Sequence, residues 1–571
     1  MVEDQVLGTF FASLFCGVDG FHDIYWSSQK HTIWDKNQIY KRLSVSFKVL
    51  VSDPLAKEGV AILKGFCEVD EKADLSEDEL VKIIGEYDAL IVRSGTQVTA
   101  RIIEAADKMK YIGRAGVGVD NIDTDAATKK GIIVSNAPEG NTLAATEHTI
   151  AMMMALARNI PQATASLKKG EWKRSKFMGN EMNGKVLGVV GFGRIGREVA
   201  KRAQALQMTV IAYDPFIPAE VGAAMGVEMM SVAELFTKAD VITVHTPLIP
   251  STTHIVNKES IATMKTGVRL INCARGGIID EAALYDALVS GKVAGAALDV
   301  FETEPPTESP LLKLDSVIVT PHLGASTVEA QKNVAISVAN QCMDVLNGGS
   351  AKNAVNAPLV APEVKSKVDP YALLAEKMGS LAAQIADGAI TKIEFAYLGE
   401  VSNLKQNLKY VTRLGIKGML EKVLHEPVNI VNAEFIAQSR GITIFEKTSA
   451  EAGDYKSLVT LTFKTEKGNG SISGIVTRVG PRIVSIGKYS TDLVPNGYVI
   501  LADHVNRPGV VGPVGMILGK HNVNISSMQV GGMNVGAESL MILAVDDVVS
   551  PEVMKEVASS DGITGAKFVQ L

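Results

Sequence analysis

Cysteine is scarce in this chain of 571 residues, which has only four, at positions 16, 67, 273 and 342. Their spacing fits neither a zinc site nor a redox motif, so we expect no metal centre and no disulfide scaffold. Such cysteine usage is typical of a reducing compartment, which predicts a cytoplasmic protein.

Long hydrophobic runs and clusters of basic residues are also missing. No apolar run approaches the roughly 18 residues that a membrane-spanning helix needs. The formal net charge of -6 and the lack of a lysine- or arginine-rich run argue against non-specific binding to nucleic acid. We therefore expect neither a membrane nor a nucleic acid among the partners of this chain.

Residues 1–47 differ from the rest of the chain. They hold nine aromatic residues and no sustained helical or strand period. Their acidic residues disfavour a transit peptide, and no basic region precedes their apolar part as in a secretory signal. We interpret them as an accessory N-terminal segment or an artefact of the assigned start, and the first domain is predicted to begin at Lys48.

The clearest motif lies between residues 185 and 215. An apolar run at 186–190 predicts a buried parallel strand, which leads into the glycine turn GFGRIG at 191–196. A helix from 194 to about 207 and a second strand follow, and that strand ends at Asp214. The order of strand, glycine turn, helix, strand and acid is typical of a nucleotide-binding unit.

Each glycine of this unit has a separate role. Gly191 permits the tight turn, Gly193 lets the backbone approach a pyrophosphate, and Gly196 lets the helix pack against the strand. The helix N-terminus offers unpaired N–H groups to the phosphates. Asp214 would bind a ribose 2′-hydroxyl and repel a 2′-phosphate, so the predicted cofactor is NAD.

From Lys48 to about residue 320, predicted strands and helices alternate. This pattern predicts parallel sheets with helices on both faces, and ligands bind where the carboxyl ends of such strands meet. Arg93 follows an early strand, and three later strands are followed by Arg275, Glu304 and His322. An arginine, an acid and a histidine are thus delivered to one edge of one sheet.

These three residues could together oxidise a hydroxy acid. A histidine can take the hydroxyl proton while hydride leaves for a nicotinamide, a carboxylate can orient the ring, and an arginine can bind the substrate carboxylate. His245 also follows a strand, but we interpret it as lining the nucleotide cleft. We interpret His148, which lies mid-helix among apolar residues, as structural.

The segments GFGRIG with Asp214, NCARGGIIDE, ALDVFETEPP and TPHLGAST together resemble the D-isomer-specific 2-hydroxyacid dehydrogenase family, from Lys48 to about Lys352. The resemblance implies two Rossmann-like α/β domains with doubly wound parallel sheets and NAD between them. It assigns residues 48–148 and 327–352 to substrate binding and residues 149–326 to NAD binding. It also implies that Arg275, Glu304 and His322 are the catalytic residues.

Within the family, the segments RSGT, GRAGVGVDNID, PEGNT and HLGAST are similar to those of members that oxidise 3-phospho-D-glycerate to 3-phosphooxypyruvate, the first step of L-serine biosynthesis. This similarity implies that the substrate is held by Arg93, Ser94, Gly95 and Asn141. It implies that the cofactor is bound by Gly191, Gly193, Arg194, Ile195, Gly196, Asp214, Val117, Thr246, Cys273 and Asp299. It further implies a homo-oligomer, by resemblance a tetramer.

Two more domains are expected towards the C-terminus. Residues 354–495 mix helices with alternating strands and carry no catalytic set, which predicts an α+β intervening domain with an interaction or regulatory role. Residues 498–571 follow the ferredoxin-like order β-α-β-β-α-β. This unit resembles an amino-acid-binding ACT domain, and that resemblance implies that an effector, L-serine, is contacted across a paired interface by His504, Asn506 and Asn524.

The sequence therefore predicts an NAD-dependent oxidation of 3-phospho-D-glycerate. One rival is a dehydrogenase for glyoxylate, hydroxypyruvate or another small 2-hydroxy acid. A second rival is an NAD-sensing transcriptional corepressor built on the same fold, which the apparent amino-acid sensor at the C-terminus disfavours.

Overall fold

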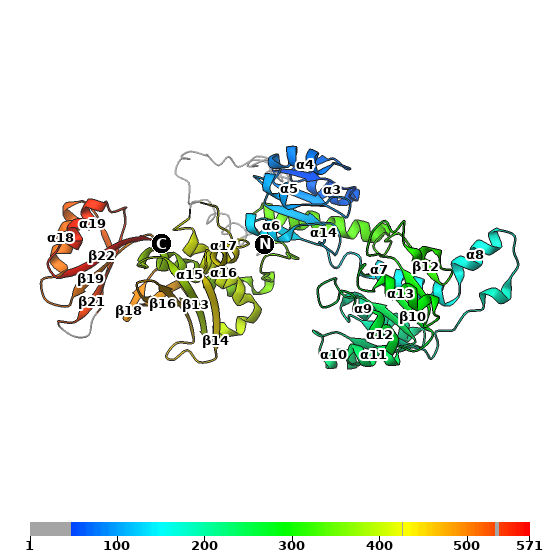
Figure 1. Ribbon diagram of the computed structural model, residues 1–571. Helices are drawn as coiled ribbons and strands as arrows, with labels where there is room; N and C mark the ends of the chain where they lie inside the picture. Colours follow the sequence, from blue (N-terminus) through cyan, green and yellow to red (C-terminus); the bar gives the residue numbers. More distant parts are fainter. Residues whose placement is uncertain (1–46, 425, 532–535) are drawn as a thin grey trace, which may run out of the picture. The chain divides into compact units, whose positions relative to one another are not determined.

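The computed structural model describes residues 47–424, 426–531 and 536–571, and their strands form four sheets (Figure 1). The predicted accessory segment at residues 1–47 lies outside the described residues, apart from Phe47. The predicted fold class is confirmed, because two parallel α/β sheets are followed by a mixed sheet and by a ferredoxin-like unit.

The first sheet is built from the N-terminal part of the described chain. Its elements are β1 (Lys48–Val51), α3 (Lys57–Lys64), β2 (Glu68–Glu71), α4 (Glu77–Ile83), η1 (Ile84–Glu86), β3 (Ala89–Val92), α5 (Ala100–Ala105), β4 (Tyr111–Arg114), α6 (Thr124–Lys130) and β5 (Ile133–Ser135). All five strands are parallel, in the order β2-β1-β3-β4-β5. The central strand β3 is a fully buried apolar run, as expected when helices cover both faces.

The second sheet contains the glycine motif. Its elements are α7 (Thr142–Ala157), α8 (Ile160–Lys168), η2 (Arg174–Phe177), β6 (Val186–Val190), α9 (Arg194–Ala205), β7 (Thr209–Tyr213), α10 (Ala219–Ala223), β8 (Glu228–Met229), α11 (Val232–Lys238), β9 (Val241–Val244), α12 (Lys258–Thr263), β10 (Val268–Asn272), α13 (Glu281–Val289), β11 (Val293–Leu298), η3 (Pro310–Lys313) and β12 (Val317–Val319). The seven parallel strands have the order β12-β11-β10-β9-β6-β7-β8. Counted from β6, this is the dinucleotide-binding order with one strand added, and the strand order reverses between β6 and β9.

Helix α14 (Val328–Leu346) carries the chain back to the five-stranded sheet. Val334, Val338 and Cys342 are buried in the core on one face of that sheet. Beyond the helix, Ala354 pairs with Ser135 at the end of β5. Residues that follow the seven-stranded sheet in the sequence therefore complete the domain of the five-stranded sheet.

A mixed sheet of six strands follows. Its elements are α15 (Pro362–Ile385), β13 (Ile390–Gly399), η4 (Glu400–Asn407), α16 (Leu408–Leu420), α17 (Ala433–Ser439), β14 (Thr443–Ser449), β15 (Ser457–Thr465), β16 (Asn469–Thr477), β17 (Gly480–Ile486) and β18 (Tyr489–Leu493). The strand order is β14-β13-β15-β16-β17-β18, and only the β13–β14 pair is parallel. Helix α15 continues through Pro370, although an interior proline usually ends a helix.

The last sheet has the ferredoxin-like topology. Its elements are β19 (Tyr498–Val505), α18 (Val511–Lys520), β20 (Ile525–Gly531), β21 (Glu538–Val545), α19 (Pro551–Ala558) and β22 (Ile563–Gln570). The antiparallel order is β20-β21-β19-β22. Helices α18 and α19 lie on the same face of this sheet (Figure 1). Its other face shares a hydrophobic core with the six-stranded sheet, to which β19 contributes Val499 and Leu501.

The described residues contain neither a membrane-spanning helix nor a candidate metal centre. None of their helices combines the length and the hydrophobicity needed to span a membrane. In the same residues, no group of three or more His, Cys, Asp and Glu side chains could hold a metal ion.

Candidate active site

The glycine turn after β6 has the geometry of a nucleotide cradle. Gly191 has a φ of +95°, and a Cβ there would lie 2.7 Å from the backbone of His245. A Cβ on Gly196 would lie 2.1 Å from the carbonyl oxygen of Gly191, so only glycine lets α9 begin this close to the turn. A Cβ on Gly193 would meet nothing within 4 Å. The space beside Gly193 is therefore open to a ligand.

Polar groups without protein partners surround this space. Helix α9 begins at Arg194 with Gly193 as its N-cap, and no side chain caps its first N–H groups. Past the end of β9, the buried Oγ1 of Thr246 has no hydrogen-bond partner among the described residues. Uncapped helix N–H groups and an unpartnered buried hydroxyl are both suited to a polar, anionic ligand. These residues fit a dinucleotide.

Asp214 lies at the predicted position, directly after β7, and is already hydrogen-bonded to the backbone. Its Oδ2 accepts from the N–H of Phe192 at 2.9 Å, and its Oδ1 accepts from the N–H of Phe216 at 2.9 Å. These bonds fix the orientation of the carboxylate. Since each oxygen has a further lone pair, Asp214 can still accept a bond from a ribose hydroxyl.

The other predicted cofactor residues occupy varied environments. Cys273 directly follows β10, and burial, with a smaller contribution from the charge of Asp299, raises the pKa of its thiol to about 12. The carbonyl of Val117 accepts a bond from the side chain of Asn136. Arg194 forms an ion pair with Glu139 at 3.5 Å, and Ile195 packs at the edge of the core around α9.

His322 and Glu304 meet at the carboxyl edge of the seven-stranded sheet. Nδ1 of His322 lies 2.9 Å from Oε2 of Glu304, while Oε1 of Glu304 accepts from the N–H of Phe301 at 3.2 Å. Both side chains are partly exposed, at 46% and 40%. Within the described residues Nε2 of His322 has no hydrogen-bond partner, so it can face a substrate.

The backbone at His322 is held in an unfavourable conformation by Asp299. His322 has a φ of +56°, which costs free energy for a residue with a side chain. Its N–H donates to the carbonyl of Asp299 at 2.9 Å. The fully buried carboxylate of Asp299 accepts from the N–H groups of Leu323 and Gly324 at 2.7 and 2.8 Å. Asp299, predicted to line the cofactor, therefore also anchors the loop that carries His322.

Two side chains complete the surroundings of Asp299. Its carboxylate also accepts from the hydroxyl of Thr320, and Nε2 of His148 lies 3.2 Å away. Burial alone would raise the pKa of Asp299, but the hydrogen bonds from His148, Thr320 and the loop outweigh it and hold that pKa below its usual value. His148 thus has hydrogen-bonding partners in the interior, as expected of a structural histidine.

Arg275 joins the two parallel sheets. It follows β10, and its Nε donates to Oδ2 of Asp120, beyond β4, at 3.0 Å. A Cβ on Gly118 would lie 1.9 Å from Nη2 of Arg275, so the glycine at this position lets the guanidinium approach the backbone. Because β10, β11 and β12 are adjacent, Arg275 lies at the same sheet edge as Glu304 and His322.

Arg114, at the end of β4, is a site residue that the sequence did not single out. Its guanidinium lies directly over Gly116, where a Cβ would be 1.3 Å from Nη1. Its Nε is buried and has no hydrogen-bond partner among the described residues. Burial and the positive charges of Arg275 and Arg93 lower the pKa of Arg114 to about 10. Arg275 and Arg93 thus repel the guanidinium of Arg114, which favours the binding of an anion, and the carboxylates of Asp120 and Asp53 offset only part of this repulsion.

The predicted substrate segment 93–96 is shaped by Asp53, which sequence analysis also missed. Its carboxylate accepts from the N–H groups of Arg93 and Thr96, at 2.5 and 3.2 Å. A Cβ on Gly95 would lie 2.6 Å from Oδ1 of Asp53. The turn is thereby fixed with Ser94 exposed at its tip.

Two further features adjoin these groups. The buried Oδ1 of Asn141, at the start of α7, has no partner in the described part of the chain, which suits a residue that binds a ligand. A hollow of about 410 Å³ lies beside the histidine and is mostly apolar; besides Glu304 and His322, residues such as Phe301, Leu312 and Val319 line it.

The predicted effector residues lie at two ends of the four-stranded sheet. Nε2 of His504 is buried and has no hydrogen-bond partner among the described residues. The same is true of the hydroxyl of Ser539, the residue of β21 that pairs with His504 of β19. The side chain of Asn524 donates to Asp546, past the other end of β21. Seven residues of strand separate the two places, or roughly 20 Å. One chain therefore cannot bring His504 and Asn524 to one small ligand.

Asn506, two residues after His504, is bound through its backbone to the segment before β21. Its N–H donates to Ala537 at 2.8 Å and its carbonyl accepts from Gly536 at 2.7 Å.

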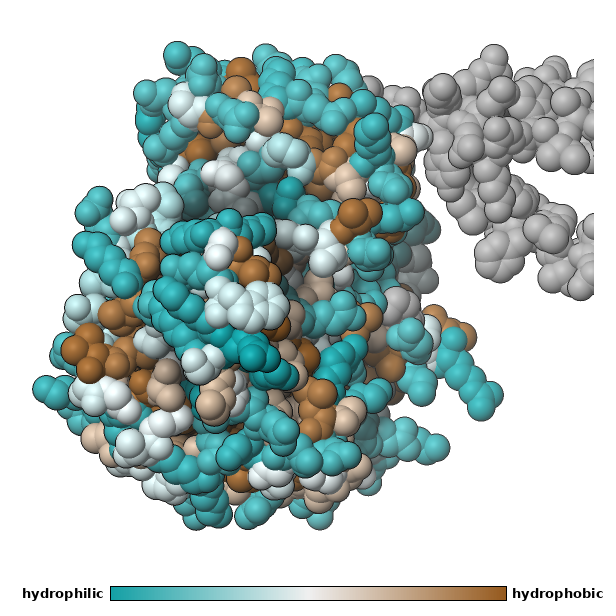
Figure 2. All heavy atoms as spheres, turned by 90° about the vertical axis from the view of Figure 1, so that its right-hand side faces the viewer, coloured by the Kyte–Doolittle hydropathy of each residue, from teal (hydrophilic) through white to brown (hydrophobic). Residues whose placement is uncertain are grey.

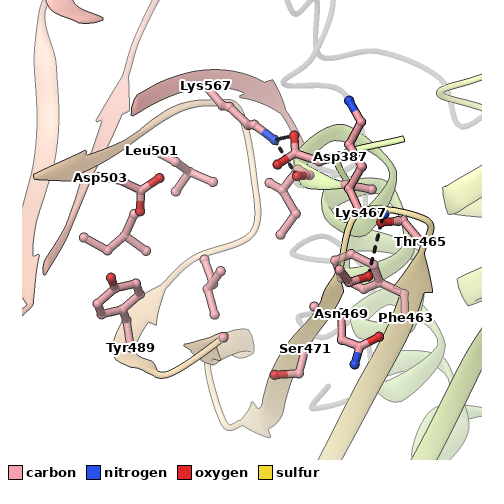
Figure 3. Close-up of a pocket in the computed structure, with 17 residues that line it drawn as sticks. Asp387, Phe463, Thr465, Lys467, Asn469, Ser471, Tyr489, Leu501, Asp503 and Lys567 are labelled. Carbon is pink, nitrogen blue, oxygen red and sulfur yellow. Dashed lines mark hydrogen bonds and ion pairs between the residues drawn. The ribbon is translucent and has the colours of Figure 1, made fainter. Parts of the chain in front are cut away.

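A cavity of about 380 Å³ is lined on one side by Leu501 and Asp503 of β19 (Figure 3). Asp503 points into it from β19, and Lys567 forms an ion pair with Asp387 at 2.8 Å along its wall. Side chains alternate along a strand, so His504 points away from this cavity and towards the layer of α18 and α19.

Comparisons with known proteins agree with this arrangement. Residues 150–324 match the D-isomer specific 2-hydroxyacid dehydrogenase NAD-binding domain, residues 367–487 match the D-3-phosphoglycerate dehydrogenase intervening domain, and residues 498–562 match the ACT domain.

Several relatives match almost the whole chain. A D-3-phosphoglycerate dehydrogenase of Methanocaldococcus jannaschii is 47% identical over 525 residues, which are 92% of this chain and 100% of the relative. The protein of that name in Bacillus subtilis is 43% identical, over 92% of this chain and 100% of its own. Among solved structures, a glyoxylate reductase from Paecilomyes thermophila superimposes with a TM-score of 0.51 at 33% identity, over 55% of this chain and 99% of its own. A D-lactate dehydrogenase from Aquifex aeolicus, complexed with NAD and lactic acid, gives 0.50 at 30% identity, over 55% and 100%.

Proposed function

Because the chain belongs to the D-3-phosphoglycerate dehydrogenase family, we propose that it oxidises 3-phospho-D-glycerate to 3-phosphooxypyruvate with a nicotinamide cofactor, the first step of L-serine biosynthesis. The observation that carries the proposal is the His322–Glu304 pair, 2.9 Å apart at the sheet edge where Arg275 also lies. A histidine backed by a carboxylate and accompanied by an arginine is what oxidation of a hydroxy acid requires.

Each catalytic residue has one role. Nε2 of His322 takes the proton of the C2 hydroxyl. Glu304 orients the ring through Nδ1 and stabilises the imidazolium that forms, while Arg275 pairs with the substrate carboxylate. When bound, the nicotinamide accepts the hydride that leaves C2.

Arg93 and Arg114, the other two arginines of the site, are suited to bind the phosphate group of the substrate. A phosphate monoester carries about -1.5 to -2 charges at pH 7, in addition to the carboxylate of this substrate. Arg93 and Arg114 supply positive charge next to Arg275, and the repulsion that Arg114 feels from the other two is relieved when an anion binds. The exposed turn at Ser94 and Gly95 and the unpartnered Oδ1 of Asn141 complete the substrate site.

The cofactor of this proposal is NAD rather than NADP. Asp214 would accept a bond from the ribose 2′-hydroxyl and repel a 2′-phosphate. Thr246 and the uncapped N–H groups of Arg194 and Ile195 would hold the pyrophosphate region, beside Gly191, Gly193 and Gly196. Val117, Cys273 and Asp299 would line the nicotinamide end.

We propose the domain limits that the sequence suggests. They are 48–148 with 327–352 for substrate binding, 149–326 for NAD, 354–495 for the intervening domain and 498–571 for the ACT domain. L-Serine is the proposed effector of the ACT domain. Since His504 and Asn524 lie too far apart in one chain, the effector site would need His504 and Asn506 of one copy and Asn524 of another.

Self-association is part of the same proposal, and a tetramer is the form expected. Large apolar side chains are exposed on and after α8, namely Ile160, Leu167, Trp172 and Met178. Figure 2 looks onto the side where α8 lies in Figure 1 and shows hydrophobic patches between hydrophilic ones. Light scattering after size exclusion would give the mass. A cytoplasmic location stays a prediction.

The proposal is tested by a coupled assay of 3-phosphoglycerate oxidation, with NAD and NADP, and with and without L-serine. Turnover should need the phosphate, so glycerate should be a poor substrate. Equal rates on both would favour the rival dehydrogenase for a small 2-hydroxy acid. Absence of turnover on any 2-hydroxy acid would favour the corepressor. His322→Ala should remove most of the turnover, while the variant should still bind NADH, as followed by the fluorescence of NADH.

A further inference from the structure

Glu281 and Glu302 exchange two hydrogen bonds. The N–H of Glu302 donates to Oε1 of Glu281 at 2.6 Å, and the N–H of Glu281 donates to Oε1 of Glu302 at 3.2 Å. Glu281 is the first residue of α13, and Glu302 lies in the segment between β11 and β12. The pair ties the start of one helix to the segment that carries Glu304.

The same segment is fixed on its other side. Phe301 is buried, and a Cβ on Gly276 would lie 1.8 Å from the carbonyl oxygen of Phe301. The N–H of Phe301 donates to Oε1 of Glu304. Residues 301–304 are thus held between the loop that carries Arg275 and the helix that begins with Glu281.

Capping of α13 does not explain Glu281. The N-cap residue is Asp280, whose Oδ1 accepts from the N–H of Ala283 at 2.9 Å. Placing Glu281 here also has a cost, because burial, with smaller contributions from the charges of Glu302 and Glu304, raises its pKa. The positive end of the α13 dipole and the N–H that Glu302 donates offset part of that cost. A third contact reaches Glu302 from Nε2 of His254, at 3.1 Å.

We propose that Glu281 is a positioning residue for catalysis, which holds the backbone of Glu302 so that the carboxylate of Glu304 stays against Nδ1 of His322. Glu281 touches neither substrate nor cofactor in this role. The inference rests on the proposed function, since it assigns the catalytic work to Glu304 and His322.

The test uses the full-length protein with three variants. Glu281→Gln keeps an oxygen that can accept from the N–H of Glu302, whereas Glu281→Ala removes it. Glu259→Ala is the matched control, because Glu259 lies in the first turn of the neighbouring helix α12 and is exposed. For each variant, kcat, KM for both substrates and the pH profile of kcat/KM are measured.

Glu281→Ala should lower kcat at least tenfold, with KM for NAD changed less than threefold. Its acid-side midpoint in kcat/KM should move to lower pH, because the imidazolium of His322 loses its aligned carboxylate. Glu281→Gln should keep more than half of kcat, and Glu259→Ala should match the wild type. Equal losses in the Gln and Ala variants, or an unmoved midpoint in the Ala variant, would overturn the inference.

If Glu281→Ala does not fold, Glu281→Asp serves instead, since its shorter side chain withdraws the carboxylate from the N–H of Glu302. It should lower kcat with the same shift of the pH profile, and an unmoved profile again contradicts the inference. His322→Ala distinguishes a failure of the proposed function from a failure of this inference. If that variant stays active, the proposed function fails; if it is inactive while the Glu281→Ala and Glu281→Asp variants behave as wild type, only this inference fails.

Discussion

Nδ1 of His322 lies 2.9 Å from Oε2 of Glu304, and the second oxygen of that carboxylate accepts a bond from the backbone of Phe301. One oxygen orients the carboxylate, and the other orients the ring. Because Nδ1 is engaged, Nε2 is the nitrogen left to exchange a proton with the substrate.

Replacement of Glu304 by glutamine should therefore affect chemistry and not cofactor binding. The amide keeps the size of the side chain but not the charge that stabilises the imidazolium. We expect kcat for 3-phosphoglycerate oxidation to fall by roughly 10²-fold or more, with the affinity for NADH nearly unchanged. Glu308→Gln, at an exposed position on the same segment, is the control and should keep its activity. A Glu304→Gln variant as active as that control would contradict the assignment.

Arg114 should matter most when the substrate carries a phosphate. Arg114→Met keeps much of the buried volume and removes the charge, so kcat/KM for 3-phosphoglycerate should fall by roughly 10²-fold. The loss on glycerate should be much smaller, and KM for NAD should stay close to the wild-type value. Arg101→Met, an exposed arginine on α5 that pairs with Asp78, is the matched control. Equal losses on both substrates would show that Arg114 does not bind the phosphate.

Elements with a strong local signal were predictable from the sequence. Strand β6 has the predicted bounds, 186–190, and β7 ends at Tyr213, directly before Asp214. Short β-branched runs that are bounded by a lysine, a glycine turn and an acid are easy to recognise in a sequence. Asp280 caps α13, and a cap of this kind can be recognised in a sequence because it is decided within four residues. His322 and Glu304 follow adjacent strands, and parallel strands place their ends at one edge.

Contacts across the fold were not predictable in the same way. The position of the Arg114 guanidinium depends on Gly116 and on Arg275, which comes from another sheet. The carboxylate of Asp299 contacts the loop that carries His322 because residues far apart in the sequence pack together there. No local sequence pattern therefore predicts that Asp299 anchors this loop. Likewise, the separation of His504 from Asn524 follows from the pairing of β19 with β21.

Asp214 provides a test of cofactor choice. Asp214→Asn keeps an oxygen that can accept from the N–H of Phe192 but has no charge to repel a 2′-phosphate. The ratio of kcat/KM with NAD to that with NADP should fall at least about tenfold, which corresponds to about 1.4 kcal/mol. Glu220→Gln, at an exposed site on α10, removes an equal charge nearby and should leave the ratio as it is. An unchanged ratio in Asp214→Asn would mean that the carboxylate does not set the preference.

His245 should make stability depend on pH. Burial lowers the pKa of its imidazole to about 4, and Nε2 lies 3.0 Å from Oγ1 of Thr243. In an unfolded chain a histidine has a pKa of about 6.5. Below that pH the unfolded state takes up a proton that the native state does not bind, so the free energy of unfolding should fall as the pH drops from about 6.5 towards 4, by at most about 1.4 kcal/mol per pH unit. His245→Gln has no titrating group, so its melting temperature should fall less steeply over this window than that of the wild type. Parallel melting curves for the two proteins between pH 7 and pH 4.5 would show that His245 does not remain neutral in the folded protein.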